Sequence, residues 1–146
     1  MKLSTLSSLF VLLSVVSLIA IAPSAFAEHG EGGMAATVEN APGSSTPGCE
    51  PDCFIPTTAT VEVGAIVTWS NTDNAAHTAT AGTPQDGPSG HFDSSLIMTG
   101  GSFSYTADTA GTFDYFCMVH PWMAGTLIVE EAGAADAAAA LSLIHI

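Results

Sequence analysis

The chain has 146 residues, of which 47% are hydrophobic, and this length suits one globular domain with end segments outside its core. Its charge is one-sided, because 14 Asp and Glu residues stand against a single basic residue, Lys2. Since almost nothing is present to neutralise phosphate, the composition excludes nucleic acids and anionic membranes as binding partners. The acidic surface either maintains solubility in a demanding medium or steers the protein toward a basic partner.

The N-terminus has the features of an export signal. Lys2 precedes an apolar run from Leu9 to Ala22, and Ala25-Phe26-Ala27 has the small-x-small form of a signal-peptidase site. We therefore expect residues 1–27 to be a signal peptide and the domain to lie outside the cytoplasm. An uncleaved anchor is the alternative, although the run is short for a bilayer and is interrupted by serines.

Residues 28–48 are rich in Gly, Ala, Ser and Pro, which predicts a flexible leader. Cys49 and Cys53 follow, and in an exported chain we expect this pair to form a disulfide. The alternative is a paired-cysteine, binuclear purple-copper site. It is disfavoured because no His follows Cys53 in that loop and Cys117 has no second Cys beside it.

Beyond the cysteine pair, the hydrophobic pattern alternates with period two in several short runs. The expected strands cover residues 58–63, 66–70, 77–81, 102–107, 112–117 and 125–129. A turn is expected at Gly64, and a long connection rich in Gly, Pro, Asp and Ser is expected over residues 82–101. This pattern predicts an all-β sandwich or barrel with Trp69, Phe113 and the Val and Ile positions in its core.

The run YFCMVHPWM places a thiol, an imidazole and a thioether at CxxHxxM spacing between two expected strands. One loop can therefore fold Cys117, His120 and Met123 around a single ion. A soft thiolate, two imidazoles and a weak axial thioether suit both Cu(I) and Cu(II). The second imidazole must come from elsewhere, and His77 is the candidate because it lies just after an expected strand. We expect these four residues to bind one copper ion.

Neighbouring side chains are expected to have other roles. Met118 is not counted as a ligand, because strand geometry should turn it away from the ion. Pro121 and Trp122 are expected to form an apolar rim where a redox partner docks. His91, in an acidic and Gly-rich connection, is expected to be exposed.

Four segments occur in the order VTWSN, AHT, GHFDS and GTFDYFCMVHPWMAG. Together they resemble the plastocyanin and amicyanin branch of the cupredoxins over residues 49–131, and the short CxxHxxM loop is more similar to amicyanin and to archaeal plastocyanin-like proteins. The resemblance implies an eight-stranded Greek-key β-sandwich, coordination through Nδ1 of His77 and His120, and an electron port at His120. The chain departs from this family at Thr78, where Asn is usual. A hydroxyl can make a similar hydrogen bond, so copper binding is still expected, but the resemblance does not predict how Thr78 affects the reduction potential.

The C-terminal region is compositionally simple. Residues 132–140 are rich in Ala, which predicts a linker. The last six residues, LSLIHI at 141–146, match the translation of a transposase adapter used to prepare DNA libraries, so we expect them to be artefactual. The alternative is a native apolar tail. If the true tail is missing, it could include a membrane anchor.

These features predict an exported type 1 blue-copper electron carrier, not an enzyme, that exchanges electrons with redox proteins bearing a basic docking patch. The alternative is an extracytoplasmic copper chaperone or storage protein, although such proteins favour exposed Met- or His-rich sites. A copper enzyme would need a second, catalytic copper site, for which too few histidines remain.

Overall fold

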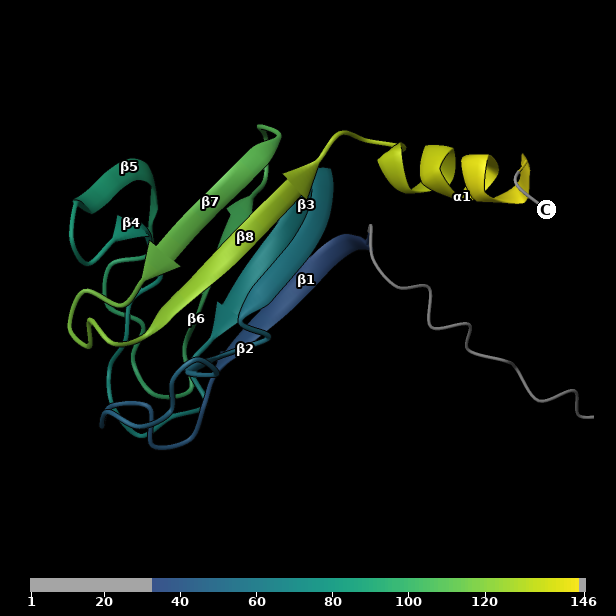
Figure 1. The fold of residues 1–146 in the computed structure, drawn as a ribbon. Coiled ribbons are helices and arrows are strands. Elements are labelled where there is room, and N and C mark those ends of the chain that lie inside the picture. The colour runs from purple at the N-terminus through teal and green to yellow at the C-terminus, as the bar shows by residue number, and fades with distance from the viewer. Residues whose placement is uncertain (1–32, 145–146) are drawn as a thin grey trace, which may run out of the picture.

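The computed structural model describes residues 33–144, which form a β-sandwich followed by one helix (Figure 1). The elements are β1 (Gly33–Asn40), β2 (Phe54–Ile55), β3 (Thr58–Ser70), β4 (Thr80–Thr83), β5 (Gly87–Asp93), β6 (Ser102–Thr106), β7 (Gly111–Phe116), β8 (Ala124–Glu130) and α1 (Ala134–Ile144). The expected signal peptide at 1–27 lies outside the described residues. Residues 33–144 contain no helix with the length and apolar character needed to cross a membrane.

The long strand β3 connects the two layers of the sandwich. Its first half pairs in parallel with β8, whereas its second half pairs in parallel with β1 and antiparallel with β6. From β8 the sheet continues through β7 and β4 to β5. The predicted all-β sandwich is confirmed, and the predicted strands at 102–107, 112–117 and 125–129 correspond to β6, β7 and β8.

The turn predicted at Gly64 is wrong, because β3 runs through this position without a break. Gly64 has φ of 93°, a left-handed value that glycine adopts at little cost. Its N–H donates to the carbonyl of Ala107 at 2.7 Å, so the backbone stays paired while it bends. The glycine therefore redirects one strand from one layer to the other.

The core is centred on Trp69, which is 1% exposed. The ring of Trp69 lies 5.2 Å from that of Phe92 and meets Tyr115 edge-on at 5.3 Å. Tyr115 in turn packs against Phe54 at 4.9 Å. The prediction for Trp69 is confirmed, whereas Phe113 lies at the border of the core and is only half-buried.

The flexible leader predicted over 28–48 is wrong from Gly33 onward, because residues 33–40 form strand β1. This strand pairs with β3 from Ala35↔Ile66 to Glu39↔Ser70. Within 35–40 it buries Val38 and the polar Asn40, and Ala36 is partly buried, so this stretch has little hydrophobic period of its own. Pairing with a partner distant in sequence stabilises it, and the folded unit begins before Cys49.

Two further predictions are wrong: the long connection expected over 82–101 contains a strand, and the strand expected at 77–81 begins later. The connection contains β5, which pairs with β4 across an irregular register of Gly and Pro residues. Strand β4 begins at Thr80, later than predicted. His77 forms an isolated bridge with Ile97 instead. Strand β5 lies at the edge of the sheet and is rich in Gly and Pro, so it lacks the alternation of apolar and polar residues that predicts a strand.

The linker predicted at 132–140 is largely helical, because α1 covers residues 134–144. Alanine has the highest intrinsic helix propensity, and a composition-based reading as a linker overlooked this property. The proposed artefactual origin of residues 141–146 stays a prediction.

Candidate metal centre

Potential ligands from two distant segments meet at one end of the sandwich. Cys117 directly follows β7, and His120 and Met123 lie in the connection to β8. His77 lies beyond the end of β3. Among the described residues, the donor atoms of His77, Cys117 and His120 form a group within 4.8 Å of one another.

The three donor atoms form a compact triangle. Cys117 Sγ lies 3.8 Å from His77 Nδ1 and 3.7 Å from His120 Nδ1, and the two Nδ1 atoms are 3.1 Å apart. Cys117, His77 and Met123 are fully buried, whereas His120 is partly exposed. One soft sulfur and two imidazole nitrogens facing one point, with a buried thioether in the same loop, are a donor set that fits copper.

The connection from Cys117 to Met123 is shaped by its own backbone. The His120 N–H donates to the Cys117 carbonyl at 3.3 Å, and the Met123 N–H donates to the His120 carbonyl at 2.9 Å. The Cys117 N–H closes the loop on the Met123 carbonyl at 3.1 Å. Because β7 and β8 pair up to Phe116↔Ala124, this loop is clamped at its base.

His77 is held instead by contacts that reach across the fold. Its backbone exchanges two hydrogen bonds with Ile97, at 3.1 and 2.8 Å. The buried Asn71 side chain donates to the carbonyls of Ala75 and Ile97 at 2.7 and 2.8 Å, and its Oδ1 accepts the Asp73 N–H at 3.0 Å. One amide thus fixes the turn that leads to His77.

Asp73 orients the His77 ring. Its Oδ2 lies 2.8 Å from His77 Nε2, and both side chains are buried. A carboxylate on Nε2 favours the tautomer with the proton there, which leaves the Nδ1 lone pair directed toward Cys117. Sequence reasoning missed Asp73, since a carboxylate four residues before a histidine is too common a pattern to single out.

The pKa values agree with a site that is ready to bind a cation. Burial raises the pKa of Asp73, but hydrogen bonds led by the Gly43 N–H and His77 outweigh it and lower the pKa to about 2. Burial and the proximity of His77 lower the pKa of His120, with Asp73 opposing. Neutral imidazole is the form that binds metals, so this shift favours coordination.

Thr78 links the two ligand-bearing segments. Its Oγ1 accepts the Met118 N–H at 2.9 Å, and its backbone N–H donates to Cys117 Sγ at 3.3 Å. The hydroxyl oxygens of Thr78 and Thr80 are 3.0 Å apart, and Thr80 Oγ1 is 3.0 Å from Asp93 Oδ1. Because a carboxylate only accepts, Thr80 donates to Asp93 and Thr78 donates to Thr80. The hydroxyl thus makes the inter-loop bond expected of it.

The remaining cysteines and His91 lie outside this group. Cys49 and Cys53 form the predicted disulfide, with sulfurs 2.06 Å apart, so the paired-cysteine metal site is wrong. His91 is not exposed as predicted but half-buried. Its ring stacks on Phe113 at 4.0 Å, and its Nε2 lies 3.1 Å from the Tyr105 hydroxyl.

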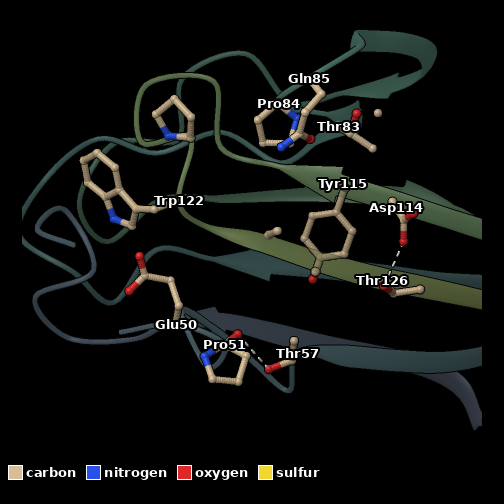
Figure 2. Close-up of a pocket in the computed structure, with 14 residues that line it drawn as sticks. Glu50, Pro51, Thr57, Thr83, Pro84, Gln85, Asp114, Tyr115, Trp122 and Thr126 are labelled. Carbon is tan, nitrogen blue, oxygen red and sulfur yellow. Dashed lines mark hydrogen bonds between the residues drawn. The ribbon is translucent and has the colours of Figure 1, made fainter. Parts of the chain in front are cut away.

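A groove of about 480 Å³ adjoins the ligand loop (Figure 2). Trp122 lies at one end of it, with its ring 5.2 Å from that of His120, and Tyr115 lies between the walls. The groove also contains the carboxylates of Glu50 and Asp114. No Lys or Arg occurs among residues 33–144, so nothing basic offsets them.

Comparisons with known proteins agree with this geometry. A family model described as copper binding proteins of the plastocyanin/azurin family matches residues 52–130. Amicyanin-alpha of Methylorubrum extorquens is 31% identical over 72 residues, which cover 48% of this chain and 58% of that relative. The match therefore spans less than two thirds of the relative's length.

Two solved structures are similar in fold. A novel purple cupredoxin from Nitrosopumilus maritimus has a TM-score of 0.60 at 25% identity, covering 65% of this chain and 99% of the other. A copper-containing nitrite reductase from Thermus scotoductus has a TM-score of 0.51 at 25% identity, covering 66% of this chain but 22% of the other.

Proposed function

The chain belongs to the plastocyanin/azurin family of copper-binding proteins, and on this premise we propose that it is an exported one-electron carrier. Its single type 1 copper ion is bound by His77, Cys117, His120 and Met123. Copper supplies the one-electron chemistry, because these ligands suit both Cu(II) and Cu(I). The observation that carries the proposal is the triangle of one sulfur and two Nδ1 atoms, 3.1 to 3.8 Å apart.

Electron transfer is fast when the geometry of the copper site changes little between oxidation states. Hydrogen bonds around the ligand residues limit such changes here. Asp73 fixes the ring of His77, and the Thr78 N–H donates to Cys117 Sγ. Hydrogen bonds of this kind orient ligands and stabilise the thiolate. His120 is partly exposed, in contrast to the fully buried His77, so its outer edge is the port through which electrons leave.

A copper chaperone or store is the alternative. Such a protein must release its metal, whereas Cys117, His77 and Met123 are completely buried. An enzyme is disfavoured for a different reason. Within 33–144, the other group of potential metal donors is Cys49, Glu50 and Cys53, whose sulfurs are already bonded. The likeness to the nitrite reductase covers 22% of that chain, so it concerns only a part of that protein.

The partner is a redox protein with a basic docking patch that covers Trp122 and the adjoining groove (Figure 2). Glu50 and Asp114 supply negative charge at the groove. Charge of one sign steers a partner of the opposite sign and accelerates encounter at low salt. Export is supported by the disulfide, which is typical of oxidising compartments.

The proposal is tested by adding Cu(II) to the purified apo-protein. One equivalent should produce an intense visible absorption that disappears on reduction and returns on reoxidation. The Cys117→Ser variant should lack it, while a Cys49→Ser/Cys53→Ser control should keep it. A colourless copper complex would overturn the assignment of the ligands. Slow electron self-exchange combined with rapid loss of copper to a chelator would favour the chaperone instead.

A further inference from the structure

The segment from Ala41 to Cys53, called the strap below, is a closed loop that begins and ends at the same place. Its base is sealed by the pairing of Asn40 with Phe54 and by the Ala41 N–H, which donates to the Cys53 carbonyl at 2.9 Å. The Cys49–Cys53 disulfide constrains it from within. The strap is thus held at its base and by a disulfide near its end, although its first part, residues 41–48, belongs to the segment expected to be a flexible leader.

One side of the strap grips Asp73. The Gly43 N–H donates to Asp73 Oδ1 at 2.8 Å, and the Ser45 N–H donates to Oδ2 at 3.2 Å. The Ser44 hydroxyl lies 3.5 Å from Oδ2, a longer and weaker contact. Because Oδ2 is the atom that contacts His77 Nε2, the strap shares its acceptor with a copper-ligand candidate.

The same stretch of strap also holds the other ligand loop. The Trp122 indole Nε1–H donates to the Ser44 carbonyl at 2.9 Å. Ser44 is fully buried, so the acceptor end of this bond is shielded from water. Trp122 directly precedes Met123 in the chain, and its ring lies beside that of His120.

We propose that the strap clamps the two copper-ligand loops together, with Asp73 and Trp122 as its positioning residues, and thereby slows the loss of copper. Strap residues 43–45 contact both loops, at Asp73 in one and at Trp122 in the other. The ligands that these loops carry, His77 and Cys117, are 40 positions apart in the sequence. Loosening either contact should therefore disturb the other. The proposal rests on the copper ligands proposed above but not on electron transfer.

The first test uses the apo-protein, where copper plays no part. Amide hydrogen exchange at Gly43 and Ser45 should accelerate at least tenfold in Trp122→Phe, which keeps an aromatic ring but lacks the N–H donor. If the strap acts as one unit, loss of the Trp122 bond exposes amides that contact only Asp73. Unchanged exchange at both amides would show that the two contacts are independent and would overturn the proposal.

The second test measures the loss of copper to an excess of chelator. In Asp73→Asn, the side-chain NH2 group faces one of the backbone N–H groups from which the carboxylate accepts a hydrogen bond, so two donors oppose each other. Changes to such outer partners of a metal ligand cost about 10- to 100-fold in metal affinity. We expect copper release about 10- to 100-fold faster in Asp73→Asn, and a smaller acceleration in Trp122→Phe. Thr46→Ala is the matched control, because Thr46 lies next to residues 43–45 in the strap and is exposed, so its rate of copper release should stay near wild type.

The third test asks whether the disulfide belongs to the same unit. In the Cys49→Ser/Cys53→Ser background, the strap is less constrained, so Trp122→Phe should accelerate copper release by a smaller factor than in the wild type. Equal factors in the two backgrounds would contradict the coupling. If the copper complex proves colourless, the exchange test on the apo-protein still decides the proposal, so its failure and that of the proposed function remain distinguishable.

Discussion

The two segments that bring ligand candidates to the site are held in different ways. The loop from Cys117 to Met123 closes on itself through three backbone hydrogen bonds above the β7–β8 hairpin. His77 is instead fixed by Asn71, Asp73 and Ile97, with the strap behind Asp73. The first segment is determined by local chain geometry, whereas the second depends on contacts between distant parts of the chain.

This difference assigns separate tasks to the two imidazoles. His120 sits on a self-contained loop at the surface, where a partner can approach it. His77 is buried in a polar network and serves as the fixed point of the site. Damage to the network around His77 should therefore affect the whole fold, whereas damage around His120 should remain local.

The largest expected effect separates the two histidines directly. His77→Gly and His120→Gly should both lose the intense absorption of the copper complex, because each removes a ligand. Added imidazole should restore the absorption in His120→Gly, whose vacated position opens to solvent, but not in His77→Gly, which is closed. Titration with imidazole, followed by visible spectroscopy, measures this. Equal rescue of both variants would show that the two histidine positions do not differ in access from solvent.

A smaller effect is expected from Asn71→Ala. This change removes three hydrogen bonds of the buried Asn71 side chain, to the carbonyls of Ala75 and Ile97 and from the Asp73 N–H. At about 1 kcal/mol for each bond, we expect the apo-protein to lose about 3 kcal/mol of unfolding free energy. The neighbouring Asn74→Ala should cost less than about 0.5 kcal/mol, because Asn74 is exposed. Urea denaturation of both variants provides the measurement. A similar loss in each would show that the network is not what fixes His77.

The same network predicts an acid dependence of stability. Since hydrogen bonds lower the pKa of Asp73 from 3.8 to about 2, its ionised form stabilises the fold above about pH 4. This contribution disappears as the pH falls through about 2, and it amounts to about 2 kcal/mol. The difference in unfolding free energy between wild-type apo-protein and Asp73→Asn should therefore shrink from pH 5 to pH 2. A difference that is constant with pH would contradict this origin.

The smallest effect is expected where the two segments meet at Thr78. Thr78→Val removes the acceptor of the Met118 N–H and should cost about 1 kcal/mol, while Thr78→Ser should remain near wild type. Because this bond ties the loop next to Cys117 to the segment of His77, the valine variant should also shift the reduction potential of the copper-loaded protein. Potentiometry on both variants checks this. Identical potentials would show that the Thr78 hydroxyl does not influence the reduction potential.

The sequence predicts the features that depend on local chain geometry better than those that depend on contacts between distant parts of the chain. Cys117, His120 and Met123 are close in the chain, so their spacing alone predicts a shared site. Strands with strong alternation, such as β6 and β8, are also predictable. The Cys49–Cys53 disulfide is predictable because the two cysteines are close in the sequence and the N-terminus has the features of an export signal.

The features that sequence reasoning missed depend on long-range contacts. β1 has little hydrophobic period and forms by pairing with β3, and the strap behind it looks like a flexible leader. Asp73 gains its role only because the strap donates to it from about 30 positions away. No local sequence pattern encodes contacts between residues so far apart in the chain.

The proposed ligand set and its rigidity are tested by X-ray absorption at the copper edge of the loaded protein, in its oxidised and reduced forms. Two nitrogen ligands and one short sulfur ligand are expected in both forms, with little change in their distances from copper on reduction. Loss of a nitrogen ligand on reduction, or a copper environment without sulfur, would contradict it.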